Sequence, residues 1–348
     1  MNLLRTRGGR AAGVVAVAAA LVTALAGCSG SSSASNGSGG SGDVRIFMAP
    51  KFTGLSYFEI ARAGGEEAAK DVKAKFQYVG SNTPSATAQI QTLQNAVAQK
   101  PSALVVAAID ENAVAPVLKQ AMKNGTKVVT FDADAATSAR DLFVNQMSYE
   151  KAAETMLDAA LKNDPNGGRV AFIAASPSAP NHKAQIADMK KLIDTDPRYS
   201  KLKYVDAVQY ANDDEQKSFD AAVNLMQSVS DLKFIISPSA VSLPAAAQAV
   251  VAQKKQGKVY ATGFALPSSM KQFVTDGSVK AFAMWDPKEL GYVATVVAND
   301  LATGKIKGKE GDVIDAGKAG KFTVGANGEI LYNKPLMFTK DNIAQYNF

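Results

Sequence analysis

The sequence predicts an α/β protein with two doubly wound parallel-sheet lobes joined by a hinge. Short apolar runs alternate with helical patterns from residue 44 onward, which is the pattern of repeated strand–helix units. Four such repeats within about 90 residues favour one parallel sheet. A second series of the same kind begins after residue 145, so two similar sheets are expected.

The first series is predicted from the spacing of its apolar residues. Residues 103–107 are all apolar, which indicates a strand buried on both faces. Asn124-Gly125 ends the helix before the fourth strand. The predicted strands are 44–48, 76–79, 103–107, 127–131 and 142–145, and the helices are 57–72, a segment after Pro84 with Ile90, Leu93 and Val97 on one face, and 114–121.

The second series repeats this alternation. Its predicted strands are 169–174, 202–208, 234–237, 258–263 and 280–285, and its helices lie around 153–161, 181–194, 219–226, 243–253 and 267–276. A further amphipathic helix is predicted at 286–303. The lobes are therefore expected to comprise 43–144 plus 286–305, and 145–285 plus 306–348.

The remainder of the chain is predicted to be irregular. Residues 305–320 are rich in Lys and Gly and indicate a loop or hairpin. Asn327-Gly328 between 322–324 and 329–332 predicts a terminal β-hairpin. The tail 338–348 carries apolar Ile343, Tyr346 and Phe348, and we expect it to dock on the body of the protein.

The first 27 residues have the features of a signal peptide. Arg5, Arg7 and Arg10 precede an apolar, alanine-rich run at 13–25, which is short for a membrane span. The sequence Leu25-Ala26-Gly27-Cys28 resembles the lipobox of bacterial lipoprotein signals, and this resemblance implies lipid modification of Cys28. An uncleaved anchor or a plain secretory signal is the alternative. Residues 28–42 are mostly Gly and Ser and are expected to form a flexible tether.

Composition excludes several classes of protein. With 47% hydrophobic and 20% charged residues in 348, the chain can bury a sizeable core. The net charge of +6 falls to about +3 once the three signal-peptide arginines are removed, and no dense basic patch with aromatic residues suggests nucleic acid as a partner. Cys28 is the single cysteine, so disulfides, thiolate metal sites and cysteine nucleophiles are not expected.

Polar and aromatic residues stand where the predicted strands end. Ligands of open α/β sheets bind outside the carboxyl ends of the strands, so these residues are expected to face a cleft between the lobes. The candidate ligand-binding residues are Lys51, Tyr57, Phe58, Asp132, Asp134, Asn145, Asn181, His182, Pro238, Ser239, Ala240, Trp285 and Asp286.

These residue types suit a ligand with many hydroxyl groups. Carboxylates such as Asp132, Asp134 and Asp286 accept hydrogen bonds from hydroxyls, while Lys51 and Asn181 donate them. A ligand without the matching hydroxyl leaves a buried carboxylate unpaired, so such sites discriminate strongly. The single tryptophan, Trp285, is suited to stack on the C–H face of a sugar.

Other interpretations of the same residues remain open. Lys51 is equally compatible with a solvated lysine, and Tyr57, Phe58 and Trp285 with core aromatics. Either aspartate of Asp132-Ala133-Asp134 could cap the following turn, and His182 could cap a helix instead of lining a pocket. Asp132-Ala133-Asp134 could also be a metal-binding motif of a transferase, but neither a phosphate-binding loop nor a third carboxylate cluster accompanies it. No catalytic residue, metal or cofactor is therefore assigned.

Several motifs resemble those of the periplasmic solute-binding proteins of ABC sugar importers, in the ribose-binding-like type I branch. Within that branch the chain looks most similar to rhamnose-binding and autoinducer-2-binding proteins. The matching stretches are Pro50-Lys51, 131–134, 144–146, 175–178, 243–248, Trp285-Asp286-Pro287 and 338–343. The resemblance implies ligand contacts from Lys51 and Asp132. Asn181-His182 replaces the Asp-Gln of autoinducer-2 binders, and its Asn is similar to rhamnose-type members.

The resemblance implies a lipid-anchored binding protein on the extracytoplasmic face of the cell membrane. Such a protein captures a monosaccharide or polyol, such as a rhamnose-like deoxyhexose, a pentose or a short polyol, by hinge closure. Its partners would be an ABC permease and its ATPase, and it would act as a monomer without enzymatic activity. The alternatives are an autoinducer-2 binding protein, a chemoreceptor-linked sugar sensor and, from another class, a sugar-phosphate enzyme.

Overall fold

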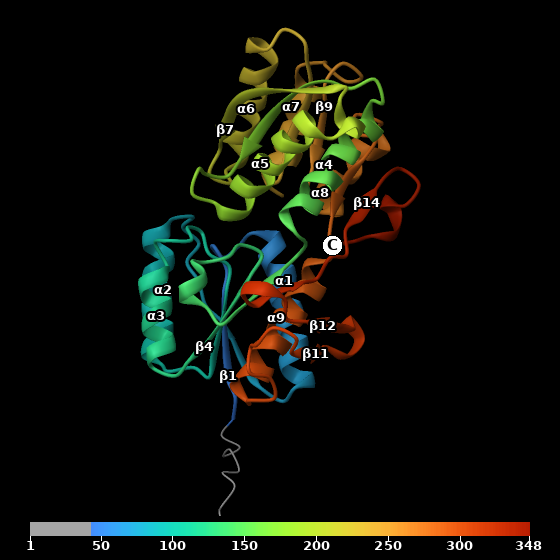
Figure 1. Cartoon of the computed structure of the whole chain (residues 1–348). Helices are drawn as coiled ribbons and strands as arrows, with labels where there is room; N and C mark the ends of the chain where they lie inside the picture. The colour runs from blue at the N-terminus through green and yellow to red at the C-terminus, as the bar shows by residue number, and fades with distance from the viewer. Residues whose placement is uncertain (1–42) are drawn as a thin grey trace, which may run out of the picture. The chain divides into compact units, whose positions relative to one another are not determined.

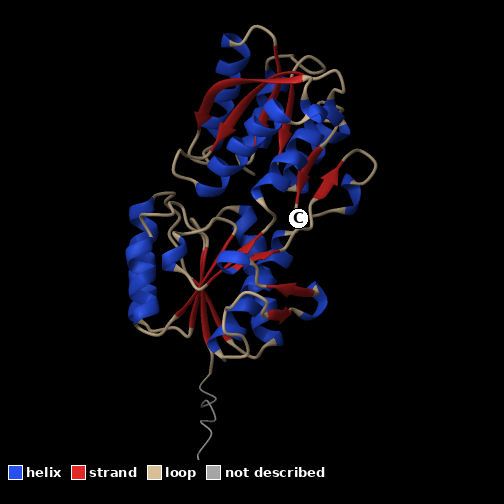
Figure 2. Ribbon diagram, viewed as in Figure 1, coloured by secondary structure: helices blue, strands red, loops and turns tan. Residues whose placement is uncertain are grey.

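The computed structural model describes residues 43–348 (Figure 1). The predicted signal peptide, Cys28 and the tether lie outside the described residues. Two parallel sheets form the body, as the alternating sequence pattern predicted. Each sheet defines a lobe, and helices cover both faces of each sheet (Figure 2).

The first lobe is built on a six-stranded parallel sheet with the order β13-β5-β4-β3-β1-β2. Its strands are β1 (Arg45–Ala49), β2 (Lys75–Tyr78), β3 (Ala103–Val106), β4 (Lys127–Phe131), β5 (Leu142–Asn145) and β13 (Glu329–Leu331). Its helices are α1 (Ser56–Asp71), α2 (Ala86–Ala98), α3 (Ala115–Lys123) and α9 (Pro287–Ala302).

Alternate residues of β1 are buried in two different hydrophobic clusters. Ile46 and Met48 lie in the cluster that contains Phe58 of α1, whereas Phe47 lies in the cluster that contains Leu93 of α2. Successive side chains of a strand point to opposite faces of the sheet, so this lobe has a hydrophobic core on each face.

The second lobe repeats this design with the strand order β7-β6-β8-β9. Its parallel strands are β6 (Gly168–Ala174), β7 (Leu202–Tyr210), β8 (Leu232–Ser237) and β9 (Tyr260–Gly263), and its helices are α4 (Tyr149–Asn163), α5 (Pro180–Thr195), α6 (Glu215–Ser228), α7 (Ser242–Ala252) and α8 (Pro267–Thr275). A bridge from Phe264 to Ala283 continues the sheet to β10 (Phe282–Met284), and β14 (Leu336–Phe338) pairs antiparallel with β10.

The predicted terminal hairpin is wrong. Strand β12 (Lys321–Thr323) pairs with β11 (Val313–Asp315), while β13 lies parallel to β5. Asn327 and Gly328 do adopt the left-handed backbone that an Asn-Gly turn requires, with φ of 55° and 71°. The segments on either side of this turn go to different sheets, and Ile330 is fully buried where β13 covers the edge of β5.

This pairing also changes the expected lobe boundary. Residues 306–348 were expected to belong wholly to the second lobe, but β13 adds a strand to the first sheet. The chain enters the second lobe again only at β14. It therefore crosses between the lobes after β5, before α9 and after β13. Short 3₁₀ helices occupy Thr137–Ala139, Pro197–Tyr199, Gly317–Ala319, Ala326–Gly328 and Ile343–Gln345.

The C-terminal tail docks on the second lobe, as predicted. The ring of Phe338 lies 4.9 Å from that of Tyr346 and 6.4 Å from that of Phe348. The backbone N–H of Ser268, at the start of α8, donates to the carbonyl oxygen of Phe348. The aromatic residues of the tail thus fix the last strand beside β10.

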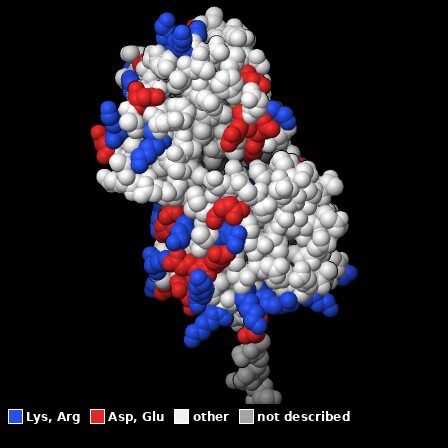
Figure 3. Space-filling view, turned by 180° about the vertical axis from the view of Figure 1, so that it is seen from behind, with Lys and Arg blue, Asp and Glu red and all other residues white. Residues whose placement is uncertain are grey.

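Charged side chains of both signs are interspersed on the face shown in Figure 3, which has no continuous basic patch. Within residues 43–348, none of the helices combines the length and the apolar character that a membrane crossing needs.

Candidate ligand-binding site

Two neighbouring cavities lie where both lobes meet at the carboxyl ends of their strands. The Trp285 cavity has a volume of about 40 Å³ and is lined by Lys51, Leu55, Tyr57, Phe58, Asp132, Asn181, His182, Asp213, Pro238, Ser239, Ala240, Val241, Met284 and Trp285. The Ser176 cavity has a volume of about 180 Å³ and is lined by Lys51, Phe52, Pro84, Ser85, Ala86, Ile109, Asp110, Ala175, Ser176, Ser178, Ala179, Asn212 and Asp213. Lys51 and Asp213 line both cavities, so the two spaces adjoin.

A buried chain of polar contacts links the lobes at the Trp285 cavity. The indole Nε1 of Trp285 donates to the hydroxyl oxygen of Tyr57 at 2.9 Å, and this hydroxyl donates to Oδ1 of Asp132 at 3.0 Å. Trp285 follows β10 of the second lobe, whereas Tyr57 and Asp132 belong to the first. Each ring therefore has its polar atom satisfied and its apolar surface packed, as buried Tyr and Trp require.

Lys51 stands opposite Asp132 in the same cavity. Its Nζ lies 3.5 Å from Oδ2 of Asp132, and both side chains are only 7% exposed. Burial raises the pKa of Asp132 above its usual value, although the charge of Lys51 and the hydrogen bond from Tyr57 oppose the increase. Asp132 also has a left-handed backbone, with φ of 60°, which turns the chain sharply at the end of β4.

The first turn of α5 supplies Asn181 and His182. The Nδ1 of His182 accepts the backbone N–H of Ala175 at 3.2 Å. Burial and the nearby charge of Lys51 lower the pKa of His182 well below its usual value, so the ring is neutral and carries its proton on Nε2. Oδ1 of Asn181 is buried and has no hydrogen-bond partner within residues 43–348. Such an atom needs a donor, which a ligand or a water molecule would supply.

We expect acid to destabilise the protein through His182, which is the only histidine in the chain. The unfolded chain takes up this proton below about pH 6.5, whereas the folded state does so only at lower pH because its pKa is lowered. Above about pH 6.5 His182 is neutral in both states and does not reduce the free energy of unfolding. Below this pH the free energy of unfolding falls by at most about 1.4 kcal/mol per pH unit, because only the unfolded chain takes up the proton.

Urea unfolding at pH 7 and pH 5 tests this expectation. Wild type should lose about 2 kcal/mol more than His182→Asn between these values. The introduced asparagine can still accept the Ala175 N–H, and carboxylates that titrate nearby are common to both proteins. Equal losses in the two proteins would mean that His182 is solvated and titrates normally.

The loop between β8 and α7 brings Pro238, Ser239 and Ala240 to the Trp285 cavity. The Oγ of Ser239 accepts the N–H groups of Val241 and Ser242 at 3.2 Å each and so satisfies the N-terminus of α7. The helices α1 and α5 also begin at the cavities, but neither has a side-chain cap. Pro180, the first residue of α5, has no N–H, so Asn181 and His182 carry the first backbone donors of this helix.

Ten of the thirteen candidate residues line the Trp285 cavity, and three do not line either cavity. Asp134 is held by the hydroxyl of Thr130 at 2.5 Å and by Nε of Arg140 at 2.7 Å. Asn145 donates to Oε1 of Glu329 at 2.7 Å, and Asp286 accepts the N–H groups that start α9. These three side chains therefore already have structural partners.

Asp213 is the polar residue of the Trp285 cavity that the sequence interpretation missed, and in the Ser176 cavity it also missed Ser85, Asp110, Ser176, Ser178 and Asn212. Asp213 follows β7, which ends at Tyr210 rather than at residue 208 as predicted. The rule that selected Asp132, a polar residue just past a strand, applies equally to Asn212-Asp213-Asp214. The apolar lining from Leu55, Val241 and Met284 has no comparable signal in the sequence, since such residues are usual in any core.

The chemistry of this site is that of hydrogen bonding. Within the described part of the chain, His, Cys, Asp and Glu do not form any group of three or more that would suit a metal ion. The lining instead combines carboxylate acceptors, a cation, amide and hydroxyl groups, and aromatic rings. These groups both donate and accept hydrogen bonds, as the hydroxyls of a polyhydroxylated molecule do.

Comparison with known proteins agrees with this geometry. Residues 46–306 match the family model described as periplasmic binding protein domain. The structure of a sugar ABC transporter from Actinomyces odontolyticus is 38% identical, with a TM-score of 0.73, and the match covers 88% of this chain and 98% of that one.

Two other solved structures are each 27% identical over 88% of this chain, with TM-scores of 0.82. One is an ABC transporter solute-binding protein from Clostridium phytofermentas with bound L-rhamnose, of which 98% is covered. The other is LsrB from Clostridium saccharobutylicum in complex with AI-2, of which 100% is covered. Proteins of this kind bind their ligands without converting them. The chain belongs to the periplasmic binding protein family of ABC-transporter solute-binding proteins.

Proposed function

We propose that this protein captures an uncharged monosaccharide or short polyol between its lobes and delivers it to an ABC permease. One observation carries the proposal: Lys51 and Asp132 of the first lobe and Asn181, His182 and Trp285 of the second line one cavity. A ligand that contacts both lobes favours the closed arrangement by its higher affinity for it. The three chain crossings between the lobes provide the hinge for this closure.

The polar groups favour a rhamnose-like deoxyhexose, a pentose or a short polyol. Asp132 accepts a hydrogen bond from a ligand hydroxyl, and Lys51 donates one to a ligand oxygen. Asn181 Oδ1, which has no partner within residues 43–348, accepts a hydrogen bond from a second ligand hydroxyl. The Trp285 cavity alone has room for about three water molecules, so a sugar would extend past Lys51 into the Ser176 cavity. AI-2 is the second candidate, because the 27% identical LsrB was solved with it.

The sequence adds two parts to the proposal. The segment before Cys28 supports lipid anchoring on the outer face of the cell membrane. Intact-mass analysis of the protein purified from membranes tests this, because an acylated Cys28 adds the mass of the lipid. The predicted partners are a permease and its cytoplasmic ATPase.

A thermal-shift screen tests the proposed ligand class. The compounds are L-rhamnose, D-arabinose, D-ribose, xylitol and AI-2, and matched uncharged solutes without vicinal hydroxyls serve as controls. A compound at 100 times its dissociation constant adds about 2.7 kcal/mol to the free energy of unfolding. A shift with a sugar or polyol supports the proposal, a shift with AI-2 alone supports the second candidate, and no shift with any compound contradicts both.

A further inference from the structure

Each lobe presents one aspartate to the cleft from a left-handed backbone position. Asp132 follows β4 of the first lobe with φ of 60°, and Asp213 follows β7 of the second lobe with φ of 51°. Asn212, immediately before Asp213, is also left-handed, with φ of 54°. Non-glycine residues rarely adopt this conformation, and where they do it often serves a functional site.

The surroundings of Asp213 hold its carboxylate in place. Its Oδ1 accepts the hydroxyl of Ser239 at 2.5 Å, and Ser239 is itself fixed by the N-terminus of α7. The N–H of Asn212 donates to the carbonyl oxygen of Ala175 at 2.7 Å, which ties the loop to the end of β6. Oδ2 of Asp213 has no hydrogen-bond partner in the described chain, 43–348. One carboxylate oxygen is thus anchored and the other remains available.

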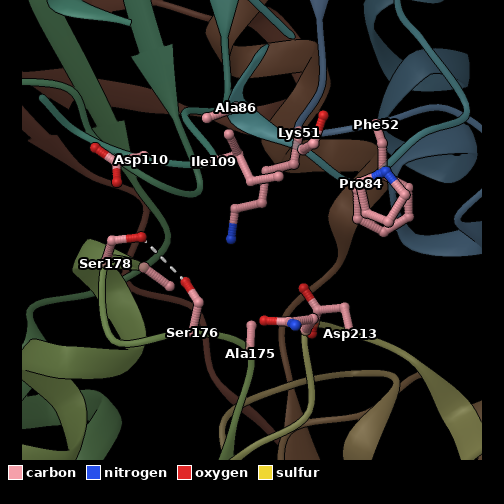
Figure 4. A pocket seen from close by; sticks show the side chains of 13 residues that line it. Lys51, Phe52, Pro84, Ala86, Ile109, Asp110, Ala175, Ser176, Ser178 and Asp213 are labelled. Carbon is pink, nitrogen blue, oxygen red and sulfur yellow. Dashed lines mark hydrogen bonds between the residues drawn. The ribbon is translucent and has the colours of Figure 1, made fainter. Parts of the chain in front are cut away.

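Asp213 lies at the junction of the two cavities. Asp213 lines both of them, and Figure 4 shows Lys51 extending from the first lobe into the space that Asp213, Ser176 and Ser178 border from the second. The pKa of Asp132 is raised mainly by burial and further by the charge of Asp213, as expected when the two carboxylates face a common space.

The charges around this space do not cancel. The charged residues that line the two cavities are Lys51, Asp110, Asp132 and Asp213, and His182 is neutral. One cation among three carboxylates gives a net charge of −2. Such a lining accepts hydrogen bonds from hydroxyl groups and repels anions.

We propose that Asp213 is a ligand-contacting residue that determines specificity, accepting a ligand hydroxyl from the second lobe while Asp132 accepts another from the first. This inference rests on the proposed function. Facing carboxylates oppose closure of an empty cleft, and a polyol that donates to both removes this opposition. The pair therefore selects uncharged ligands with hydroxyls on two sides and disfavours sugar acids and sugar phosphates.

Isothermal titration of wild type, Asp213→Asn and Asp214→Asn tests the inference, with whichever of L-rhamnose, D-arabinose, D-ribose and xylitol binds wild type most tightly. In Asp213→Asn, the introduced amide can still accept the Ser239 hydroxyl, and asparagine tolerates the left-handed backbone. Asp214 does not line either cavity; it caps α6, and asparagine caps equally well. We expect Asp213→Asn to weaken binding about 10- to 100-fold and Asp214→Asn to leave it within about twofold.

The outcomes separate this inference from the proposed function. If wild type binds a compound and Asp213→Asn binds it equally well, only the role of Asp213 is overturned. If wild type binds none of the four, the proposed sugar function fails and this inference fails with it. Asp213→Gly provides a second variant, because glycine suits φ of 51° and removes the carboxylate altogether. Unchanged affinity in that variant would likewise overturn the inference.

Discussion

Replacing Asp132 by asparagine is expected to remove most of the ligand-induced thermal shift without unfolding the protein. The carboxylate is buried, and a charge-assisted hydrogen bond to a ligand hydroxyl is worth about 2 to 3 kcal/mol, or roughly 30- to 150-fold in affinity. At 100 times the wild-type dissociation constant, a 100-fold loss reduces the ligand-dependent stabilisation from about 2.7 to about 0.4 kcal/mol. Calorimetric titration gives the affinity directly.

The same substitution leaves the buried Lys51 without its partner, but it should lower the stability of the ligand-free protein less than the loss of a fully compensated ion pair would. Because burial raises the pKa of Asp132, the folded state holds this carboxylate less favourably as an anion than the unfolded chain does. The protonated Asp132 carboxyl therefore contributes to the free energy of unfolding at low pH, and this contribution is lost as the pH rises through the folded-state pKa. A neutral asparagine avoids the cost of the buried anion at pH 7. Asparagine also accepts the left-handed backbone at this position.

Asp134→Asn is the matched control, and we expect the opposite result from it. Asp134 is paired with Arg140, whose side chain is 4% exposed, and it does not line either cavity. Loss of this pair should lower the free energy of unfolding by about 3 kcal/mol and leave affinity unchanged. Unchanged affinity in Asp132→Asn would remove Asp132 from the binding site.

Replacing Gly64 by alanine is expected to lower the free energy of unfolding by about 3 kcal/mol. Gly64 of α1 lies against α9, and a Cβ atom there would lie 1.8 Å from the carbonyl oxygen of Lys288. The contact is reciprocal, since a Cβ on Gly291 would lie 2.1 Å from the carbonyl oxygen of Ala61. Backbone atoms on both sides cannot move aside, so the helices must separate. Urea unfolding measures the loss.

Gly65→Ala is the control for this prediction. The three atoms nearest to a Cβ on Gly65 belong to side chains, the end of Met48 at 2.8 Å and the ring of Phe76 at 2.8 and 2.9 Å. The methionine end moves easily, and the half-buried Phe76 ring lies at the edge of the core and can shift. The gain in helix propensity is about 1 kcal/mol in both variants, so Gly65→Ala should stay within about 1 kcal/mol of wild type. Equal stability of the two variants would show that α1 and α9 separate without cost. Because α1 carries Tyr57, Gly64→Ala should also weaken the Trp285–Tyr57 hydrogen bond and ligand binding.

The alternation of apolar runs and helical patterns was sufficient to predict both sheets. A parallel strand that is buried on both faces has a continuous apolar sequence, as at Ala103–Val106. Such a strand can be predicted from its own residues, without knowing which strands lie beside it. Strand-end polarity likewise predicted Lys51, Asp132, Asn181 and Trp285, which line one cavity. These features depend on local periodicity and on one general property of α/β sheets.

The pairing of the last strands could not be read in this way. Asn327-Gly328 forms the left-handed turn that its residues favour, yet β13 joins β5 of the first sheet and β14 joins β10 of the second. Local turn chemistry sets the direction of the chain but not which exposed edge it covers. That choice depends on the burial of Ile330 and Phe338 against residues far away in the sequence.

The sequence by itself determined the α/β class, the two lobes and most of the residues at the strand ends. Only the tertiary structure decided which of those residues share a cavity. Asp132 and Asp134 differ by two positions, but one faces Lys51 and the other is held by Arg140. Asp213 joins the site because the lobes bring strand ends together across the cleft. Convergence of side chains is a property of packing, and packing depends on contacts between residues that are distant in the chain.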